Sequence, residues 1–255
     1  MELEDSRLVG EIVRIPHNDA HLVGKFIECG KKLVIFAHGL GAHKDQRFLA
    51  YLAAHLPGYS TIRFDMPGNG DSPGMFTLGY QAEVDAIDSV VNWALARGLA
   101  PTLVVGHSKG ADEVLLHAAQ RASVPAVVAL SGRGDMAVQP EGRYSTQQMA
   151  QLASTGQFIK RFGDVDRVVT QAMMDERVSL DMRQISAIPP SVCVTVVHGT
   201  ADEIIPYKDA DLLTQYIGAG GCEATRVLFE GCDHGYHGFE ARVRDLLADI
   251  LAQVI

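Results

Sequence analysis

The sequence predicts an α/β fold with a mainly parallel, eight-stranded sheet flanked by helices. From residue 33 onward, strand-like and helical patterns alternate, which is the order expected when crossover helices join parallel strands. Most of the later strand-like runs are continuously apolar, as in strands that are buried on both faces of a sheet. The first two runs have no helix between them and therefore predict an antiparallel hairpin at one edge.

Eight runs are apolar enough to predict strands. In chain order they are Glu11–Ile15, Leu22–Glu28, Leu33–Ala37, Thr61–Asp65, Thr102–Gly106, Ala126–Leu130, Val192–His198 and Thr225–Phe229. Five segments between and after these runs place apolar residues at helical spacing, as Val84, Ile87 and Val91 do in the second. The predicted helices are Lys44–His55, Tyr80–Arg97, Ser108–Arg121, Lys208–Ile217 and Tyr236–Val254.

One connection is too long for a simple crossover. About sixty residues separate the sixth predicted strand from the seventh, whereas connections in compact domains are usually much shorter. They contain helical patterns near Thr146–Ser154 and Val165–Asp175 and no good strand. We therefore expect residues 1–132 and 191–255 to form the core, with residues 133–190 as a helical cap over the carboxyl edge of the sheet. An ordinary, elaborated crossover is the alternative.

The composition limits the possible partners. The chain has 255 residues and a formal net charge of −9, which argues against a nucleic-acid partner. The acidic segment Met1–Asp5 lacks the layout of a signal peptide, and no apolar run approaches the roughly 18 residues that span a membrane. Without a secretory signal, the cysteines are expected to be free thiols, and the protein is expected to be cytoplasmic. These cysteines are Cys29, Cys193, Cys222 and Cys232.

The segment Gly106–Gly110 has the pattern G-x-S-x-G and directly follows a predicted strand. A serine nucleophile must stand on a sharp turn between a strand and a helix, where its oxygen is exposed. The flanking glycines let the backbone pack closely around such a turn. The pattern alone is common, but its place between a strand and a helix makes Ser108 the candidate nucleophile.

A serine hydroxyl needs a base to take its proton, and a histidine held by a carboxylate is the usual base. His234 follows the last predicted strand and is the candidate base, with His237, expected within the last helix, as the alternative. Asp202 follows the preceding strand and is the candidate orienting acid, with Glu203 as a distant second. A helix-capping role is the structural alternative for either acid. The order Ser108, Asp202, His234 is the order expected when successive strand ends supply the three groups.

The oxyanion that forms in such a reaction needs two backbone N–H donors. One is expected from Lys109, which follows the candidate nucleophile. The other is expected from Leu40, which lies in the sequence HGLG (residues 38–41) directly after the third predicted strand. His38 and the two glycines are expected to shape this turn rather than to take part in the chemistry.

Four segments in this order resemble the α/β-hydrolase superfamily. They are the HGLG loop, the GHSKG turn, the segment HGTADEIIP (198–206) and the segment GCDHGYH (231–237). The glycine-rich turn Asp65–Ser72 is also similar. Over about residues 20–255, the chain looks closest to small esterases of the cinnamoyl/feruloyl-esterase-like and serine-aminopeptidase-like (Hydrolase_4) group.

The resemblance implies an α/β-hydrolase fold with a short helical cap between the sixth and seventh strands. It also implies a Ser108–Asp202–His234 triad with Leu40 and Lys109 as oxyanion donors. Lys109 departs from the family pattern, which more often has Met, Leu or Gln at this position. Only the backbone of this residue needs to act, so the triad is unaffected, while a cation near the pocket could tune the choice of substrate.

Together these residues predict a serine hydrolase that cleaves a small-molecule carboxylic ester through an acyl-enzyme on Ser108. Amide, thioester and acyl-glycerol substrates stay open, as does a small-molecule receptor with little turnover. No cofactor is expected, because the glycine-rich turns lack a nucleotide-binding pattern. No metal is expected, because the cluster at residues 232–237 lacks a second well-placed group of ligands. The sequence leaves the oligomeric state open.

The lining of the pocket is harder to predict. Apolar residues of the cap either line a substrate pocket or form a small core of the cap itself. They are Met149, Phe158, Phe162, Met173 and Met174. Arg133, at the start of the cap, either meets a substrate carboxylate or pairs with an acidic neighbour.

Overall fold

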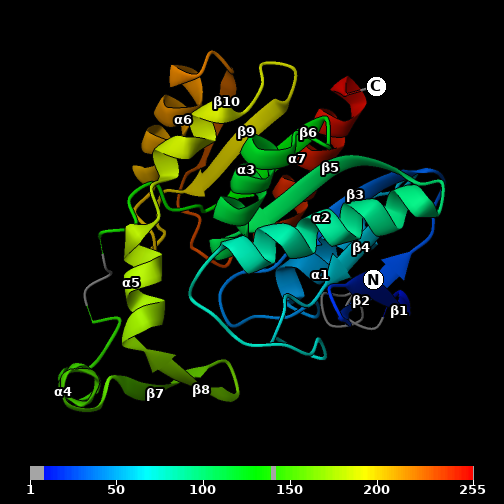
Figure 1. Cartoon of the computed structure of the whole chain (residues 1–255). Helices are drawn as coiled ribbons and strands as arrows, with labels where there is room; N and C mark the ends of the chain where they lie inside the picture. The colour runs from blue at the N-terminus through cyan, green and yellow to red at the C-terminus, as the bar shows by residue number, and fades with distance from the viewer. Residues whose placement is uncertain (1–8, 139–141, 255) are drawn as a thin grey trace.

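The computed structural model describes residues 9–138 and 142–254. Its main feature is an eight-stranded sheet with the strand order β1-β2-β4-β3-β5-β6-β9-β10 (Figure 1). The strands are β1 (Glu11–His17), β2 (Ala20–Ile27), β3 (Lys32–Ala37), β4 (Ser60–Phe64), β5 (Ala100–His107), β6 (Ala126–Leu130), β9 (Cys193–Gly199) and β10 (Ala224–Phe229). β2 pairs antiparallel with β1 and β4, and the other neighbours are parallel. The predicted mainly parallel sheet with an edge hairpin is confirmed.

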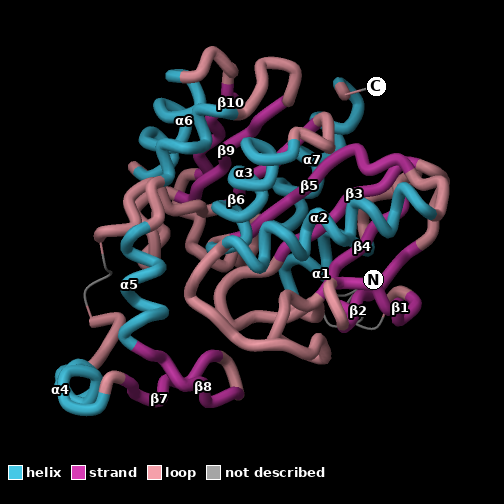
Figure 2. Tube along the Cα trace, viewed as in Figure 1, coloured by secondary structure: helices cyan, strands magenta, loops and turns pink. Residues whose placement is uncertain are grey.

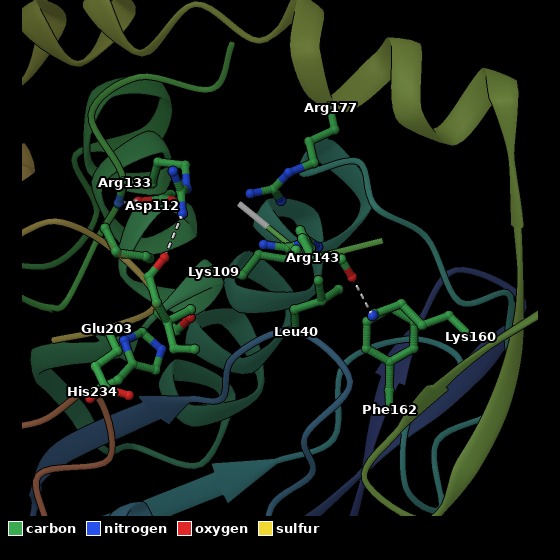
Figure 3. Close-up of a pocket in the computed structure, with 14 residues that line it drawn as sticks. Leu40, Lys109, Asp112, Arg133, Arg143, Lys160, Phe162, Arg177, Glu203 and His234 are labelled. Carbon is green, nitrogen blue, oxygen red and sulfur yellow. Dashed lines mark hydrogen bonds between the residues drawn. The ribbon is translucent and has the colours of Figure 1, made fainter. Parts of the chain in front are cut away.

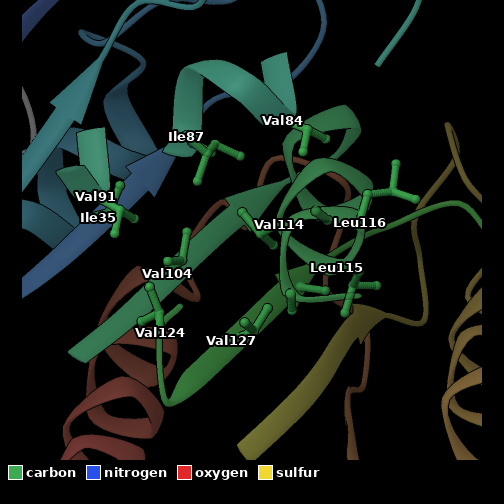
Figure 4. Packing of buried hydrophobic residues seen from close by; sticks show 14 of the residues in the cluster. Ile35, Val84, Ile87, Val91, Val104, Val114, Leu115, Leu116, Val124 and Val127 are labelled. Atoms are coloured by element: carbon green, nitrogen blue, oxygen red, sulfur yellow. The ribbon is translucent and has the colours of Figure 1, made fainter. Parts of the chain in front are cut away.

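Helices cover both faces of this sheet (Figure 1). α1 (Arg47–Ala54) and α7 (Glu240–Gln253) pack in one hydrophobic cluster, and α2 (Gln81–Ala96), α3 (Lys109–Arg121) and α6 (Asp209–Ala219) pack in the other. Side chains alternate between the faces along each strand, so neighbouring residues of β3 enter different clusters. Figure 4 shows the cluster between α2, α3 and the sheet. Two apolar layers therefore hold the central strands in place, and the turns at their carboxyl ends rest on a rigid base.

The last helix starts later than predicted. The pattern predicts a helix from Tyr236, but α7 begins at Glu240. The backbone has a positive φ at Tyr236 (56°) and again at Gly238 (76°), which a right-handed helix does not allow. His237 therefore lies in a turn before the helix and not within it.

The segment between β6 and β9 is not the all-helical cap that the sequence predicts. It contains α4 (Thr146–Thr155), a two-stranded antiparallel hairpin, α5 (Gln171–Ser179) and the 3₁₀ helix η2 (Met182–Ala187). The hairpin strands are β7 (Gln157–Phe162) and β8 (Val165–Thr170). Figure 2 shows that α4, the hairpin and α5 lie together at one side of the sheet domain. The predicted helix near Thr146–Ser154 is present as α4.

The helix predicted over Val165–Asp175 is wrong in its first half. Val165, Val168 and Val169 have the i, i+3, i+4 spacing of a helix face. In the structure these residues lie in β8, where Val169 is buried opposite Phe158 while the other two valines are exposed. The deciding interaction is the pairing of this strand with β7, which a pattern within one segment does not reveal.

Two further expectations concern the chain as a whole. In the two described ranges, no helix is long and apolar enough to cross a membrane. All four cysteines are free thiols, as predicted, with Cys29 and Cys193 exposed and Cys222 and Cys232 buried. The acidic segment Met1–Asp5 lies outside the described residues.

Candidate active site

Ser108 stands on a sharp turn between β5 and α3. Its backbone has φ 57° and ψ −121°, a region that non-glycine residues rarely adopt. Space around the turn is tight, because a methyl group on Gly106 would collide with the backbone of Gly110. One on Gly110 would come within 2.6 Å of the carbonyl oxygen of Ala37. The two glycines of the G-x-S-x-G pattern are thus required by close packing, and they hold Ser108 at the carboxyl edge of the sheet.

Asp202 and His234 lie in the loops that follow β9 and β10. His234 Nδ1 donates a hydrogen bond of 2.7 Å to Asp202 Oδ2. The other oxygen, Asp202 Oδ1, accepts the N–H groups of Ile204 and Ile205 at 2.9 and 2.8 Å. The Asp202 side chain is fully buried, whereas the His234 side chain is 19% exposed. The carboxylate is therefore held rigidly behind an imidazole that reaches the pocket.

Asp202 keeps its charge in spite of its burial. Burial by itself would raise the pKa of the Asp202 carboxyl. Hydrogen bonds from His198, His234 and the N–H of Ile205 outweigh burial and hold this pKa well below its ordinary range. His198 is a second imidazole at this carboxylate; it is buried, with Nε2 3.2 Å from Asp202 Oδ2. An ionised Asp202 is the form that fixes the Nδ1–H tautomer of His234.

His107 contacts two loops of the candidate site, and no sequence pattern singled it out. It is the variable residue before Ser108, and its Nε2 donates to the carbonyl oxygen of His234 at 2.8 Å. Its Nδ1 accepts a hydrogen bond of 3.1 Å from Gln46 Nε2. Burial, together with the nearby His234, lowers the pKa of His107 to about 3. The neutral ring thus ties the loop of His234 to the turn of Ser108.

The two alternative residues are placed elsewhere. His237 is 76% exposed and pairs with Asp233, whose Oδ2 lies 2.7 Å from Nδ1. Glu203 is exposed at the rim of the pocket. Asp233 and His237 pair with each other and His234 pairs with Asp202, so the residues at 232–237 do not converge on one point. No group of three possible metal ligands occurs in the part of the chain that is described.

The loop after β3 passes close to Ser108. A methyl group on Gly39 would lie 3.0 Å from the Cβ of Ser108, so this loop packs directly on the nucleophile turn. His38 is buried, with Nδ1 2.8 Å from the carbonyl oxygen of Gly39 and with Nε2 accepting the N–H of Met66. His38 thus shapes the loop, as expected from the sequence.

The predicted oxyanion donors both reach the same pocket. Leu40 N–H has no hydrogen-bond partner among the residues that are described. Lys109 is the first residue of α3, so its N–H has no acceptor within the helix. Two unpaired N–H groups beside Ser108 can stabilise an oxygen that gains negative charge.

These groups line a single cavity of about 430 Å³, a size suited to a small molecule. Figure 3 shows His234 at one side of this cavity and Arg177, which extends from α5, at the opposite side. The lining residues are Leu40, Ser108, Lys109, Asp112, Arg133, Gly142, Arg143, Lys160, Phe162, Arg177, Glu203, Ile204, Ile205 and His234. Residues from β7, α5 and the loop before α4 thus complete a pocket that is otherwise formed by the loops after the sheet strands and by the start of α3.

The apolar residues predicted for the pocket have three different positions. Phe162 lines it. Phe158 and Met174 are buried in a small separate core, and Met173 packs against that core. Met149 is 42% exposed and belongs to neither group. Phe162 also packs against that core, so four of the five residues belong to it or contact it. The core includes Phe76 and Leu78 from outside the cap segment, so it is not formed by the cap alone.

The side chain of Lys109 is not free to meet a substrate. It is buried, contacts Glu83, and places Nζ 3.0 Å from Glu113 Oε1. Its ammonium also lies 4.9 Å from the ring centroid of Tyr80. Burial lowers the pKa of Lys109 and raises that of Glu113, while the attraction between the two charges opposes both effects. Lys109 is therefore held by its own ion pairs.

Arg133 is buried and lines the pocket. Its guanidinium donates to the carbonyl oxygens of Val138 and Ile204 at 3.1 and 3.0 Å. Its backbone N–H donates to Asp112 Oδ1 at 2.7 Å. Burial raises the pKa of Asp112 well above its ordinary value. The sequence singled out Lys109 and Arg133 as cations near the pocket, whereas Arg143, Lys160 and Arg177 also line it and were not predicted.

The comparisons with known proteins agree with this architecture. The alpha/beta hydrolase family matches residues 34–248 of the chain. No curated protein sequence matches significantly. Est1E from Butyrivibrio proteoclasticus, solved with ferulic acid bound, has a TM-score of 0.77 at 20% identity and covers 94% of this chain and 98% of its own.

Two further solved structures are similar at comparably low identity. Alpha/beta hydrolase domain-containing protein 10 from mouse has a TM-score of 0.72 at 18% identity, over 94% of this chain and 100% of its own. The monoacylglycerol lipase of Paleococcus ferrophilus has a TM-score of 0.69 at 19% identity, over 92% and 99%. At these identities the likeness shows the fold, while the family match extends over most of the chain. The chain therefore belongs to the alpha/beta hydrolase family.

Proposed function

We propose that the protein is a serine hydrolase that cleaves a small-molecule carboxylic ester through an acyl-enzyme on Ser108. The observation that carries this proposal is the joint placement of Ser108 on a strained turn and of the hydrogen-bonded Asp202–His234 pair, all at one cavity. The unpaired N–H groups of Leu40 and Lys109 beside the serine also support it. Solved structures of the same fold include an esterase domain from Rhodothermus marinus and a monoacylglycerol lipase.

In this proposal the groups act in sequence. Ser108 Oγ attacks the ester carbonyl carbon, and His234 takes the hydroxyl proton. Asp202 holds the Nδ1–H tautomer and stabilises the imidazolium that results. The N–H groups of Leu40 and Lys109 hold the tetrahedral oxyanion. His234 then protonates the leaving alkoxide, which departs and leaves the acyl group on Ser108.

The second half of the cycle uses the same groups. His234 takes a proton from water, and the resulting hydroxide attacks the acyl-enzyme. The acid is released, and Ser108 regains its proton from His234. Within the described residues, no hydrogen bond joins Ser108 Oγ to His234, and we expect this contact to tighten when substrate binds, as is common for unliganded sites.

Hydrolysis of p-nitrophenyl esters, from acetate to longer acyl chains, tests the proposal. We expect wild type to release p-nitrophenol and Ser108→Ala to lose about 10³-fold or more in kcat, because triad members act as a unit. The acyl chain length with the highest kcat/KM would indicate how long an acyl group the pocket accommodates. A fluorophosphonate should label wild type at Ser108, as read by mass spectrometry of the peptide. Near-full activity of Ser108→Ala, or labelling at another residue, would contradict the proposal.

A further inference from the structure

The pocket concentrates positive charge in an acidic protein. The whole chain has a formal net charge of −9. Yet, among the residues that the structure describes, the pocket is lined by five cationic side chains and two carboxyls. The cations are Lys109, Arg133, Arg143, Lys160 and Arg177, and the carboxyls are Asp112 and Glu203. A cleft lined by one sign of charge attracts ligands of the opposite sign.

Four of these cations lack a carboxylate partner among the described residues. Lys109 differs from them, because Glu83 and Glu113 neutralise it. Lys160 Nζ donates to the carbonyl oxygen of Arg143 at 2.7 Å, and Arg177 Nη1 donates to the hydroxyl of Tyr80 at 2.9 Å. These acceptors carry no charge. Hydrogen bonds of this kind orient the cationic groups without cancelling their charge.

Two guanidinium groups also have an N–H donor without a hydrogen-bond partner among the described residues. Arg133 Nε and Arg143 Nε are buried and have no hydrogen-bond partner within residues 9–138 and 142–254. A buried donor without a partner is costly and calls for an explanation, such as a ligand that would complete it. Both residues line the pocket, and Arg133 is almost fully buried. The unsatisfied donors therefore point to an acceptor that enters the pocket.

We propose that the ester cleaved at Ser108 carries a carboxylate, and that Arg143, Lys160 and Arg177 bind it. The inference rests on the proposed function and names the substrate class for the same site. Guanidinium groups match a carboxylate in shape and charge, and such charged hydrogen bonds are about twice as strong as neutral ones. Because Arg177 lies across the pocket from His234 (Figure 3), the carboxylate stands at the far end of the substrate from the scissile bond.

Two matched pairs of esters test this inference. p-Nitrophenyl hydrogen adipate and its methyl ester place the charge in the acyl part. 4-Acetoxybenzoate and its methyl ester place it in the alcohol part. Each kcat/KM is divided by the rate constant for alkaline hydrolysis of the same ester. We expect the charged member of at least one pair to be favoured about tenfold or more, and that pair shows which part carries the charge. Ratios near one in both pairs would overturn the inference.

Variants of the pocket cations test whether these residues cause the preference for the charged ester. Arg143→Gln and Lys160→Gln should each lower the charged-to-uncharged ratio about tenfold, whereas Arg143→Lys should retain most of it. Arg161→Gln is the matched control, because Arg161 is the next residue of β7 and its side chain is 62% exposed. It should leave the ratio unchanged. If Arg143→Gln and Lys160→Gln keep the wild-type ratio, these residues do not bind the charge and the inference is wrong.

A binding measurement separates this inference from the proposed function. Ser108→Ala protein is titrated with each ester in a calorimeter, where no turnover is needed. The inference expects tighter binding of the charged member, by about tenfold, and equal affinities would overturn it. If wild type hydrolyses none of the four esters, the proposed function fails, while the difference in affinity still decides the charge preference.

Discussion

At the scale of single residues, the chain contains two Asp–His pairs with the same short contact and different surroundings. His234 Nδ1 lies 2.7 Å from Asp202 Oδ2, and His237 Nδ1 lies 2.7 Å from Asp233 Oδ2. The first pair has a fully buried carboxylate and an imidazole at the pocket, whereas both members of the second pair are exposed. Burial strengthens the electrostatic coupling of the first pair, and solvent weakens that of the second. The second pair is therefore a natural control for the first.

Asp202→Asn should lower kcat/KM for a p-nitrophenyl ester about 10³- to 10⁴-fold. The amide fits the site, but its NH₂ group cannot accept the Nδ1–H of His234, so the imidazole loses the tautomer that the reaction needs. Asp233→Asn should change kcat/KM less than about twofold, because an exposed pair contributes little. Steady-state kinetics of the two variants, with urea unfolding as a check on folding, measures the difference. Equal losses in both variants would argue against Asp202 as the orienting acid.

At the scale of elements, the loop after β3 and the β7–β8 hairpin meet beside the candidate oxyanion site. Gly41 has φ +68°, and a methyl group there would lie 2.5 Å from the Cβ of Phe162. Gly41 follows Leu40 directly, and Phe162 lines the pocket. The hairpin therefore rests on the loop that presents the Leu40 N–H. A displaced hairpin should disturb this donor as well as the pocket wall.

Gly41→Ala should lower kcat/KM about tenfold or more, because the new methyl group displaces either the hairpin or the Leu40 N–H. Gly163→Ala is the matched control. Gly163 also has a positive φ (+55°), in the hairpin turn, but a methyl group there would meet no atom within 4 Å. Both variants should lose about 1 kcal/mol of stability to backbone strain. Only the first should lose activity, and kinetics with thermal unfolding of both proteins separates the two effects.

The sheet could be predicted from sequence because its strands are defined by local signals. Continuous apolar runs such as Ala126–Leu130 fix the buried strands, and the spacing of Val84 and Ile87 fixes a helix that covers them. The β7–β8 hairpin could not be predicted in the same way. Its strands are mostly exposed, and only the pair Phe158 and Val169 is fully buried. With one buried residue per strand, no alternation is strong enough to distinguish a strand from a helix.

The candidate site also has a part that could be predicted from sequence and a part that could not. Ser108, Asp202 and His234 follow strand ends, so a local pattern and the topology of the sheet are sufficient to select them. The pocket cations have no shared pattern, since Arg143 precedes α4, Lys160 lies in β7 and Arg177 lies in α5. Only the folded chain brings these side chains to one cavity (Figure 3). The shared positive charge of this pocket therefore could be recognised from the folded structure but not from the sequence.

At the scale of the whole molecule, several buried histidines make stability depend on pH. Burial lowers the pKa of His38, His107 and His117, most clearly at His107, where it falls to about 3. An unfolded histidine has a pKa of about 6.5. Between these values the unfolded chain binds more protons than the folded one, so His107 stabilises the fold above about pH 6.5 and this contribution falls as the pH falls toward about 3. The lowered pKa values of His38 and His117 act in the same direction.

Buried acids act in the opposite direction. Burial raises the pKa of Asp112 and of Glu113, so these two groups favour the folded state more as the pH falls through their folded pKa values toward about 4. The depressed pKa of Asp202 matters only in strong acid, because the stability that it provides is present above about pH 4. The total pH dependence is therefore a sum of opposing contributions, and a comparison of variants isolates one of them.

His107→Gln should remove about 2 kcal/mol of the change in unfolding free energy between pH 7 and pH 5. Glutamine does not titrate, and its amide can still donate toward the carbonyl oxygen of His234, so the contact that holds this loop can be kept. His43→Gln, at an exposed histidine, is the control and should leave the wild-type difference in place. Urea unfolding of the three proteins at pH 7 and pH 5 gives the comparison. If His107→Gln keeps the full wild-type difference, His107 is protonated in the folded protein at pH 5, and its neutral ring cannot be what joins the Ser108 turn to the His234 loop.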